Sequence, residues 1–282
     1  MHPGASDLTG ASMRLAFFGD IVGKSGRRAM VDHLPRLRDE LGLDAVVANG
    51  ENAAGGFGIT RAVGEELFDA GVDVITLGNH SFDQPSGLEF IENEPRVLRP
   101  ANYPPDTVPG RGSGLFDVGG YQLLVVSLHG RVFMDALDDP FVAAERELAA
   151  APLGAVADAV LVDMHAEATS EKNAMGYFCD GRASLVVGSH QHVPTADARI
   201  LPDGTAYQSD AGMCGDYHSI IGMEVEEPLR RFTTRRRTGR FEVATGPGML
   251  CGVFVETGAD GLAKRIEPLR VGQGLSEAVP AV

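Results

Sequence analysis

The stretch Ala183-Ser-Leu-Val-Val-Gly188-Ser-His190-Gln-His192 indicates both the fold class and the position of a site. Its apolar run is typical of a buried strand, and the two imidazoles that follow are separated by one residue, so both can approach one point. Four other strand-like runs also end in potential ligands, which are Asp20, Glu51 with Asn52, Asn79 with His80, and His165. Donors at the strand ends of an α/β sheet gather in one crevice. We therefore expect a pair of metal ions there.

Strand-like and helix-like segments alternate over the first part of the chain. We expect strands over residues 14–18, 44–48 and 72–77, and helices over 27–41 and 60–70. The first helix has apolar residues at 3.6 periodicity, but Pro35 inside it predicts a kink or a break. Thr60 and Gly71 have the residue types of an N-cap and a C-cap. This β-α-β-α-β order predicts a parallel sheet with right-handed crossovers.

The pattern changes after Pro100, where antiparallel strands are expected. Two hairpins turn at Gly119-Gly120 and at residues 202–204, and a helix over 140–150 lies between them. The remaining strands are expected over residues 115–118, 121–128, 159–164, 185–187, 198–201, 205–208, 251–256 and 264–269. Mixed strands with helices outside predict two packed sheets in a single domain over residues 13–282. Residues 1–12 lack any such pattern, and we expect a disordered extension there.

The composition limits which partners the protein can bind and in which cellular compartment it is expected. A net charge of −15 disfavours a nucleic-acid duplex as partner, because binding to its backbone depends on Lys and Arg. Three cysteines without a CxxC pair exclude a zinc ribbon and a thioredoxin-like motif, and they indicate a reducing compartment. The chain shows no signal-peptide pattern and no apolar run of membrane-helix length. We therefore expect a cytoplasmic protein without a membrane partner.

The candidate residues at the strand ends offer only oxygen and nitrogen donors. Such donors suit manganese, iron or zinc better than metals that prefer thiolates. Single histidines are mostly structural or exposed, which is our interpretation of the other four, His2, His33, His129 and His218. Taken alone, Asp20 fits a helix N-cap and Asn52 fits a loop-stabilising amide. The run from Gly19 to Ser25 is one residue too short for a Walker loop and is not interpreted as one.

Taken in order, these motifs resemble those of the calcineurin-like metallophosphoesterases, and more narrowly those of the YmdB-like branch. The matching stretches are Phe18–Arg27, Asn49–Gly56 and Thr195–Pro202, within a resemblance that runs from Met13 to Leu269. The resemblance implies a four-layer α/β/β/α sandwich and phosphodiesterase activity, including activity on cyclic nucleotides. Two positions depart from the superfamily pattern. Asp20-Ile-Val22 stands where Asp-x-His is usual, and Glu51 replaces the usual bridging Asp, as in the YmdB-like branch.

The resemblance also implies a role for each donor around two divalent or trivalent ions, with iron or manganese expected and zinc as an alternative. The first ion would be held by Asp20, Glu51, Asn52 and His192, and the second by Glu51, Asn79, His165 and His190. A hydroxide between the ions would attack phosphorus. His80 is not expected to be a ligand, and it would give a proton to the leaving oxygen.

The expected function is that of a metal-dependent phosphoric diester hydrolase acting on small phosphodiesters such as 2′,3′-cyclic nucleotides. A nucleotidase or phosphomonoesterase, and a regulatory metal-binding protein with incidental hydrolysis, remain alternatives. Arg131 can reach a substrate phosphate or pair with a carboxylate. The arginines between Arg230 and Arg240 indicate a solvated or subunit-facing segment, with contact to phosphate or RNA as the minor interpretation. The sequence leaves a homo-oligomer open.

Overall fold

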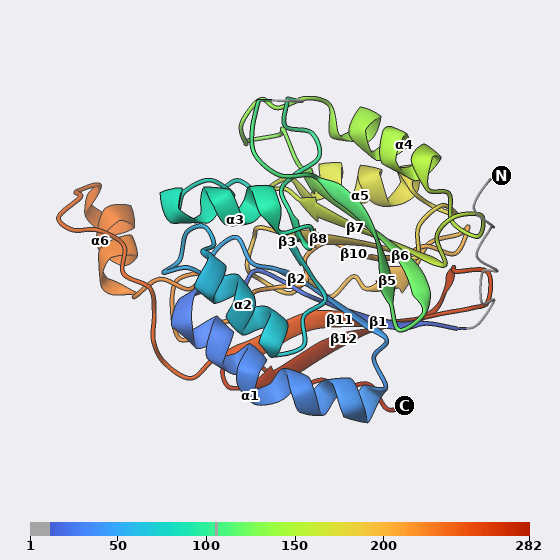
Figure 1. The fold of residues 1–282 in the computed structure, drawn as a ribbon. Coiled ribbons are helices and arrows are strands. Elements are labelled where there is room, and N and C mark those ends of the chain that lie inside the picture. Colours follow the sequence, from blue (N-terminus) through green and yellow to red (C-terminus); the bar gives the residue numbers. More distant parts are fainter. Residues whose placement is uncertain (1–11, 105–106) are drawn as a thin grey trace.

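The computed structural model describes residues 12–104 and 107–282. The extension expected over residues 1–12 therefore lies outside the described residues except for Ser12. The carbonyl of Ser12 accepts a hydrogen bond from the hydroxyl of Tyr121 at 3.0 Å. The chain folds into two six-stranded sheets with helices on their outer faces (Figure 1).

The first sheet has the strand order β12-β11-β1-β2-β3-β4. Its strands are β1 (Arg14–Phe18), β2 (Ala45–Asn49), β3 (Val74–Thr76), β4 (Val97–Leu98), β11 (Met249–Thr257) and β12 (Ala263–Gly272). Strands β1 to β4 run parallel, whereas β11 and β12 add antiparallel neighbours beside β1. The expected parallel sheet is thus present, and the two late strands extend it.

The second sheet has the strand order β5-β6-β7-β8-β10-β9. Its strands are β5 (Ser113–Val118), β6 (Tyr121–His129), β7 (Ala159–His165), β8 (Leu185–Ser189), β9 (Arg199–Ile200) and β10 (Ala206–Gln208). Strands β6, β7 and β8 are parallel, and β5 and β9 are antiparallel hairpin partners of β6 and β10. The turn between β5 and β6 places Gly119 and Gly120 at φ of 61° and 88°, which is why two glycines stand there.

Three apolar clusters join these layers. One lies between the sheets and contains Phe17, Val47 and Leu161. The second joins the first sheet to α1 (Gly23–Leu41), α2 (Arg61–Asp69) and α3 (Leu88–Asn93), which follows the 3-10 turn Pro85–Gly87. The third joins the second sheet to α4 (Pro140–Ala150) and α5 (Thr169–Phe178). This arrangement confirms the expected four-layer α/β/β/α sandwich.

A break at Pro35, one of the two expected outcomes, does not occur, because α1 runs as one helix from Gly23 to Leu41. Proline removes the hydrogen bond to the carbonyl four residues earlier, which belongs to Val31. Pro35 is exposed and Val31 is 43% exposed, so water can reach the freed carbonyl. The opposite face of the helix buries Met30, Leu34 and Leu37, and this packing keeps the helix continuous.

Two further findings concern the helices and the cysteines. Thr60 caps α2 as expected, since its hydroxyl accepts from the backbone amide of Val63 at 3.4 Å. Helices α3, α5 and α6 (Glu226–Thr234) were not expected from the sequence. The three cysteines are buried and free, as the absence of a cysteine pattern indicated. Within the described ranges, no helix is both long and apolar enough to cross a bilayer.

Candidate metal centre

Donor side chains from both sheets meet at the carboxyl-terminal ends of the strands. Asp20 follows β1, Glu51 follows β2 and Asn79 comes three residues after β3. In the second sheet β7 ends at His165, and β8 leads directly into His190. Parallel strands within each sheet end at one edge, so the alternation of strands and helices places these residues together.

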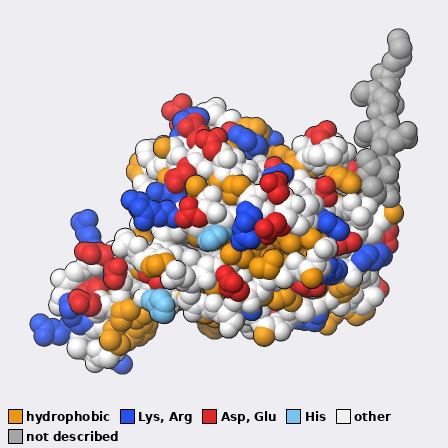
Figure 2. All heavy atoms as spheres, turned by 90° about the horizontal axis from the view of Figure 1, so that it is seen from below, with side chains coloured by type: hydrophobic (Ala, Val, Ile, Leu, Met, Phe, Trp, Pro, Cys, Tyr) orange, Lys and Arg blue, Asp and Glu red, His pale blue; other side chains and the backbone are white. Residues whose placement is uncertain are grey.

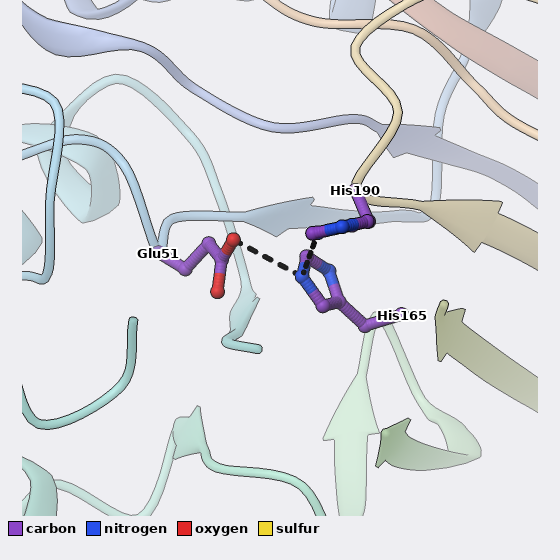
Figure 3. Close-up of side chains that lie close together, drawn as sticks. All are labelled: Glu51, His165 and His190. Atoms are coloured by element: carbon purple, nitrogen blue, oxygen red, sulfur yellow. Dashed lines mark hydrogen bonds and ion pairs between the residues drawn. The ribbon is translucent and has the colours of Figure 1, made fainter. Parts of the chain in front are cut away.

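Three of the donors already surround one point, as Figure 3 shows. The Nε2 atom of His165 lies 3.1 Å from a carboxylate oxygen of Glu51 and 3.1 Å from Nδ1 of His190. One ligand atom from each of these residues lies within 4.8 Å of the others, which is compatible with a shared metal ion. The amide oxygen of Asn79 lies 2.9 Å from the same nitrogen of His165. The group therefore offers four donors to a single ion.

Hydrogen bonds on the outer side of two imidazoles fix their tautomers. The Nδ1 atom of His165 lies 2.8 Å from the hydroxyl of Ser189, which lies 2.6 Å from the carboxylate of Asp163. A hydroxyl that donates to the carboxylate accepts from Nδ1–H, which leaves a lone pair on Nε2 of His165. His192 donates from Nδ1 to the carbonyl of Ile221 at 2.9 Å, with the same result. Such outer bonds orient histidines that bind metals.

Burial sets the charge of these groups. It lowers the pKa of His165 to about 3 and that of His190 to about 4, so both imidazoles are neutral at pH 7 and can each give a lone pair to a cation. Burial also raises the pKa of Glu51, and it raises that of Asp163 to about 7. A cation would offset the cost of holding the Glu51 carboxylate without water.

Two orphaned oxygens mark a second group of donors. Oδ1 of Asp20 and Oδ1 of Asn52 are buried without a hydrogen-bond partner among the described residues. The Asp20 atom lies 3.6 Å from Nε2 of His192. The second carboxylate oxygen of Asp20 accepts from the backbone amide of His190. The side-chain nitrogen of Asn52 donates to the carbonyl of Gly56. An unpaired buried oxygen costs about 1–3 kcal/mol, which a bound cation would relieve.

The loop that carries two of the histidines has a strained backbone. His190 and His192 have φ of 96° and 64°, a left-handed region that non-glycine residues seldom adopt. Asp210 holds the loop through the amide of Gln191 at 3.1 Å. Fully buried Lys172 lies 2.8 Å from Asp210 and 3.2 Å from the side chain of Gln191. The ion pair beneath the loop stabilises the strained conformation that directs both rings into the centre.

Two glycines leave the space that the centre occupies. A Cβ atom on Gly78 would lie 2.3 Å from Nε2 of His165 and 2.5 Å from a carboxylate oxygen of Glu51. A Cβ atom on Gly188 would lie 1.9 Å from the carbonyl oxygen of Ser209. Larger residues would displace the donors or the loop, so close approach explains these glycines.

His80 lies beside the donors and makes different contacts. Its Nδ1 atom lies 2.7 Å from the carboxylate of Asp83, and the ring meets Phe57 edge-on at 5.0 Å between centroids. Its backbone amide donates to Glu51 at 2.9 Å, which ties the residue to the centre. The hydrogen bond at Nδ1 leaves Nε2 as the nitrogen available for proton transfer.

Contacts of 3.9 Å or less link six of the seven residues that the sequence suggested as ligands, which are Asp20, Glu51, Asn79, His165, His190 and His192. The seventh, Asn52, is buried directly after Glu51 and has an unpartnered side-chain oxygen. Arg131 pairs with Asp139 at 2.9 Å, one of the two alternatives considered for it. His129 is fully buried, and neither ring nitrogen has a partner among the described residues.

Sequence reasoning missed the residues that support the ligands, which are Asp83, Asp163, Lys172, Ser189 and Asp210. One of them had a readable signal. Asp163 precedes His165 by two residues in a strand, and side chains two apart lie on the same face. The other four lie in loops, in a helix or at the end of a strand, and no such period links them to a ligand.

Comparisons with known proteins show the family to which the chain belongs. A family model described as YmdB-like protein matches residues 16–269. The 2′,3′-cyclic-nucleotide 2′-phosphodiesterase of Bacillus subtilis (strain 168) is 45% identical over 244 residues, which cover 86% of this chain and 91% of that relative. These matches confirm the resemblance inferred from the motifs.

Two solved structures extend the likeness to three dimensions. A hypothetical protein from Thermus thermophilus is 48% identical, with a TM-score of 0.85 over 93% of this chain and all of the other. A novel phosphatase from Mycoplasma pneumoniae is 34% identical, with a TM-score of 0.86 over 93% of this chain and 94% of the other. The similarity therefore spans nearly the whole of each chain.

Proposed function

From the premise that this chain belongs to the family of YmdB-like proteins, we propose that it is a metal-dependent phosphoric diester hydrolase. Its proposed substrates are small phosphodiesters, with 2′,3′-cyclic nucleotides as the leading class, because a 45% identical relative bears the name of such an enzyme. The observation that carries the proposal is the cluster of Glu51, His165 and His190, whose ligand atoms lie within 4.8 Å of one another, together with the orphaned buried oxygens of Asp20 and Asn52.

The donor set fits two ions, for which we propose iron or manganese, with zinc as the alternative. Asp20, Asn52 and His192 would hold the first, Asn79, His165 and His190 the second, and Glu51 would bridge them. When bound, such ions make a hydroxide available near neutral pH and stabilise charge on the phosphoryl oxygens. Ser189 and Ile221 keep the imidazole lone pairs directed inward.

His80 is the proposed proton donor to the leaving oxygen. Asp83 accepts from Nδ1–H and fixes the ring, so that the doubly protonated imidazolium would give its Nε2 proton to the leaving oxygen and keep the one on Nδ1. The edge contact with Phe57 restricts rotation of the ring. The backbone bond from His80 to Glu51 couples the position of the donor to that of the bridging carboxylate.

Activity assays in added Mn²⁺ test the proposal. Bis-p-nitrophenyl phosphate should be cleaved faster than p-nitrophenyl phosphate, and 2′,3′-cyclic nucleotides should be the best of a nucleotide panel. His80→Ala should lower turnover by about 10²–10⁴-fold while the metal content stays unchanged. His33→Ala, on the distant outer helix α1, is the matched control and should keep wild-type turnover. Wild-type turnover by His80→Ala would remove His80 from the mechanism.

A phosphomonoesterase is the second candidate function. The specific observation in its favour is the 34% identical structural relative described as a phosphatase. The same two-ion chemistry can cleave monoesters, so the metal centre alone does not separate the two. Faster cleavage of p-nitrophenyl phosphate than of the diester would replace the first proposal by this one.

A further inference from the structure

Residues 224–242 form a projecting arm that stands away from the sandwich. Two short segments at its base pair through the amide of Glu224 and the carbonyl of Glu242 at 2.8 Å, and helix α6 lies beyond them. Figure 1 shows α6 at the end of this arm, separated from the other helices. The arm thus presents surfaces that the body of the same chain does not cover.

One face of the arm is apolar and exposed. Phe232 is 81% exposed, Leu229 is 50% exposed and Phe241 is 40% exposed. Phe232 and Phe241 line a groove of about 430 Å³ together with Pro228 and three arginines. Figure 2 shows hydrophobic side chains gathered on the arm, which projects at the lower left of that view. Grouped exposed aromatic and aliphatic residues mark an interaction site more often than scattered ones do.

One part of the arm, residues 230–240, is strongly basic on an acidic protein. Residues 230–240 contain six arginines and no acidic residue, whereas the whole chain has a net charge of −15. Four of these arginines form no ion pair with any described carboxylate, and they are Arg235, Arg236, Arg237 and Arg240. The whole arm has six arginines and four glutamates, a net charge of +2, so the rest of the chain carries −17 and another copy of this protein offers the free arginines an acidic surface.

The body offers a matching groove between α1 and α2. Its volume is about 550 Å³, and its apolar lining comes from Val31, Pro35, Ala62 and Ala70. The same groove is lined by three carboxylates, which belong to Glu65, Glu66 and Asp69. Glu66 pairs with Arg27 at 2.7 Å and Glu65 lies 3.9 Å from Arg61, whereas Asp69 has no ion-pair partner among the described residues. Apolar side chains beside these carboxylates match the exposed phenylalanines beside arginines on the arm.

We propose that the arm of one chain docks into the α1–α2 groove of a second copy, with Phe232 entering the groove and the free arginines meeting its carboxylates. Because every chain has one arm and one groove, reciprocal docking closes a two-fold dimer with two identical contacts. Docking of the arm does not require hydrolase activity.

The base of the arm reaches the metal centre. The carbonyl of Ile221, three residues before the arm, accepts the hydrogen bond that fixes His192. Val243, directly after the arm, packs so closely on Gly23 and Gly56 that a Cβ atom on either glycine would lie 2.5 Å from it. Docking of the arm would therefore hold a segment that orients one of the proposed ligands.

The test is the mass of the 282-residue chain in solution by sedimentation over a range of concentrations. A dimer is expected, with twice the mass of the 29.8 kDa chain. Phe232→Ser should weaken the dimer at least about tenfold, as loss of a central aromatic anchor does. Phe133→Ser is the matched control, because Phe133 is 89% exposed but lies outside both the arm and the groove. Circular dichroism should show that both variants keep the fold.

The groove has its own test. Glu65→Arg combined with Asp69→Arg should also weaken the dimer at least about tenfold, through repulsion of the arm. Mixing this variant with Phe232→Ser should restore a heterodimer, since one intact arm and one intact groove remain. A monomeric wild-type chain, or a dimer that Phe232→Ser leaves unchanged, would overturn the proposal. A dimer that tolerates the groove variant would overturn the docking site.

Discussion

Replacing Ser189 by alanine removes one hydroxyl on which two buried groups depend. That hydroxyl lies 2.8 Å from Nδ1 of His165 and 2.6 Å from the carboxylate of Asp163. Alanine leaves Nδ1 without this partner, so the ring is no longer held in the tautomer that directs its Nε2 lone pair toward Glu51. Asp163 keeps its bonds from Thr76 and Asn49 and therefore remains partly satisfied.

The expected magnitudes follow from these contacts. Loss of an outer hydrogen bond to a metal-binding histidine lowers metal affinity about 10–100-fold. That range corresponds to about 1.4–2.7 kcal/mol of binding free energy. Loss of two buried hydrogen bonds, at about 1 kcal/mol each, lowers the free energy of unfolding of the metal-free protein by about 2 kcal/mol.

Ser184→Ala separates the two effects. Ser184 lies just before the start of β8, whereas Ser189 is its last residue, and the Ser184 hydroxyl also makes two buried hydrogen bonds, with Val160 and Gly261. Calorimetric titration of the metal-free proteins with Mn²⁺ should show weakened binding only for Ser189→Ala, while urea denaturation should show similar destabilisation of both. Equal Mn²⁺ affinity of wild type and Ser189→Ala would refute the role assigned to this hydroxyl.

Three further predictions concern the centre and its support. Asp20→Asn should lose the first ion and the activity while keeping the fold, because the carboxylate faces the centre; two full equivalents of metal by elemental analysis would contradict this. Lys172→Met should lower the free energy of unfolding in urea by about 3–5 kcal/mol, since Asp210 stays buried without its partner; a loss below about 1 kcal/mol would exclude that role. Chelation should lower the melting temperature, and Mn²⁺ at 100 times its Kd should restore about 2.7 kcal/mol; an unchanged melting temperature would argue against a metal centre.

Most of the sheet architecture could be predicted because its strands are short apolar runs that end in glycine and polar residues. The helix α4 over residues 140–150 matched its predicted bounds, and the hairpin at Gly119-Gly120 matched to within a few residues. The donors could be predicted for the same reason, since each stands where a run such as Val74–Leu77 stops being apolar. At these strand ends the local sequence pattern alone therefore indicates where the donor residues lie in the fold.

Helix α5 could not be predicted because it lacks a capping side chain, whereas α6 was missed although acidic residues stand in its first turn and Arg231 in its last. Helix α5 begins after Ala168 without a side-chain cap, and it buries Glu171 and Lys172, so its inward face is not apolar. Helix α6 is amphipathic, but Leu229 and Phe232 on it are exposed. A helical period of apolar residues predicts burial against an apolar core. Helix α5 instead buries Lys172, which pairs with Asp210, and α6, as we propose, packs against a second chain.

The same reasoning explains why the support of the centre is polar where a core would be apolar. An imidazole binds a cation only when its proton lies on the outer nitrogen, and an apolar neighbour cannot accept that proton. Ser189 and Ile221 supply acceptors, and Asp163 then becomes buried to hold Ser189. The left-handed backbone at His190 and His192 similarly requires Asp210, which in turn requires Lys172. The buried groups Asp163, Asp210 and Lys172 thus serve to direct lone pairs into the centre. Replacing Lys172 should disturb the centre although Lys172 bonds to none of the proposed ligands.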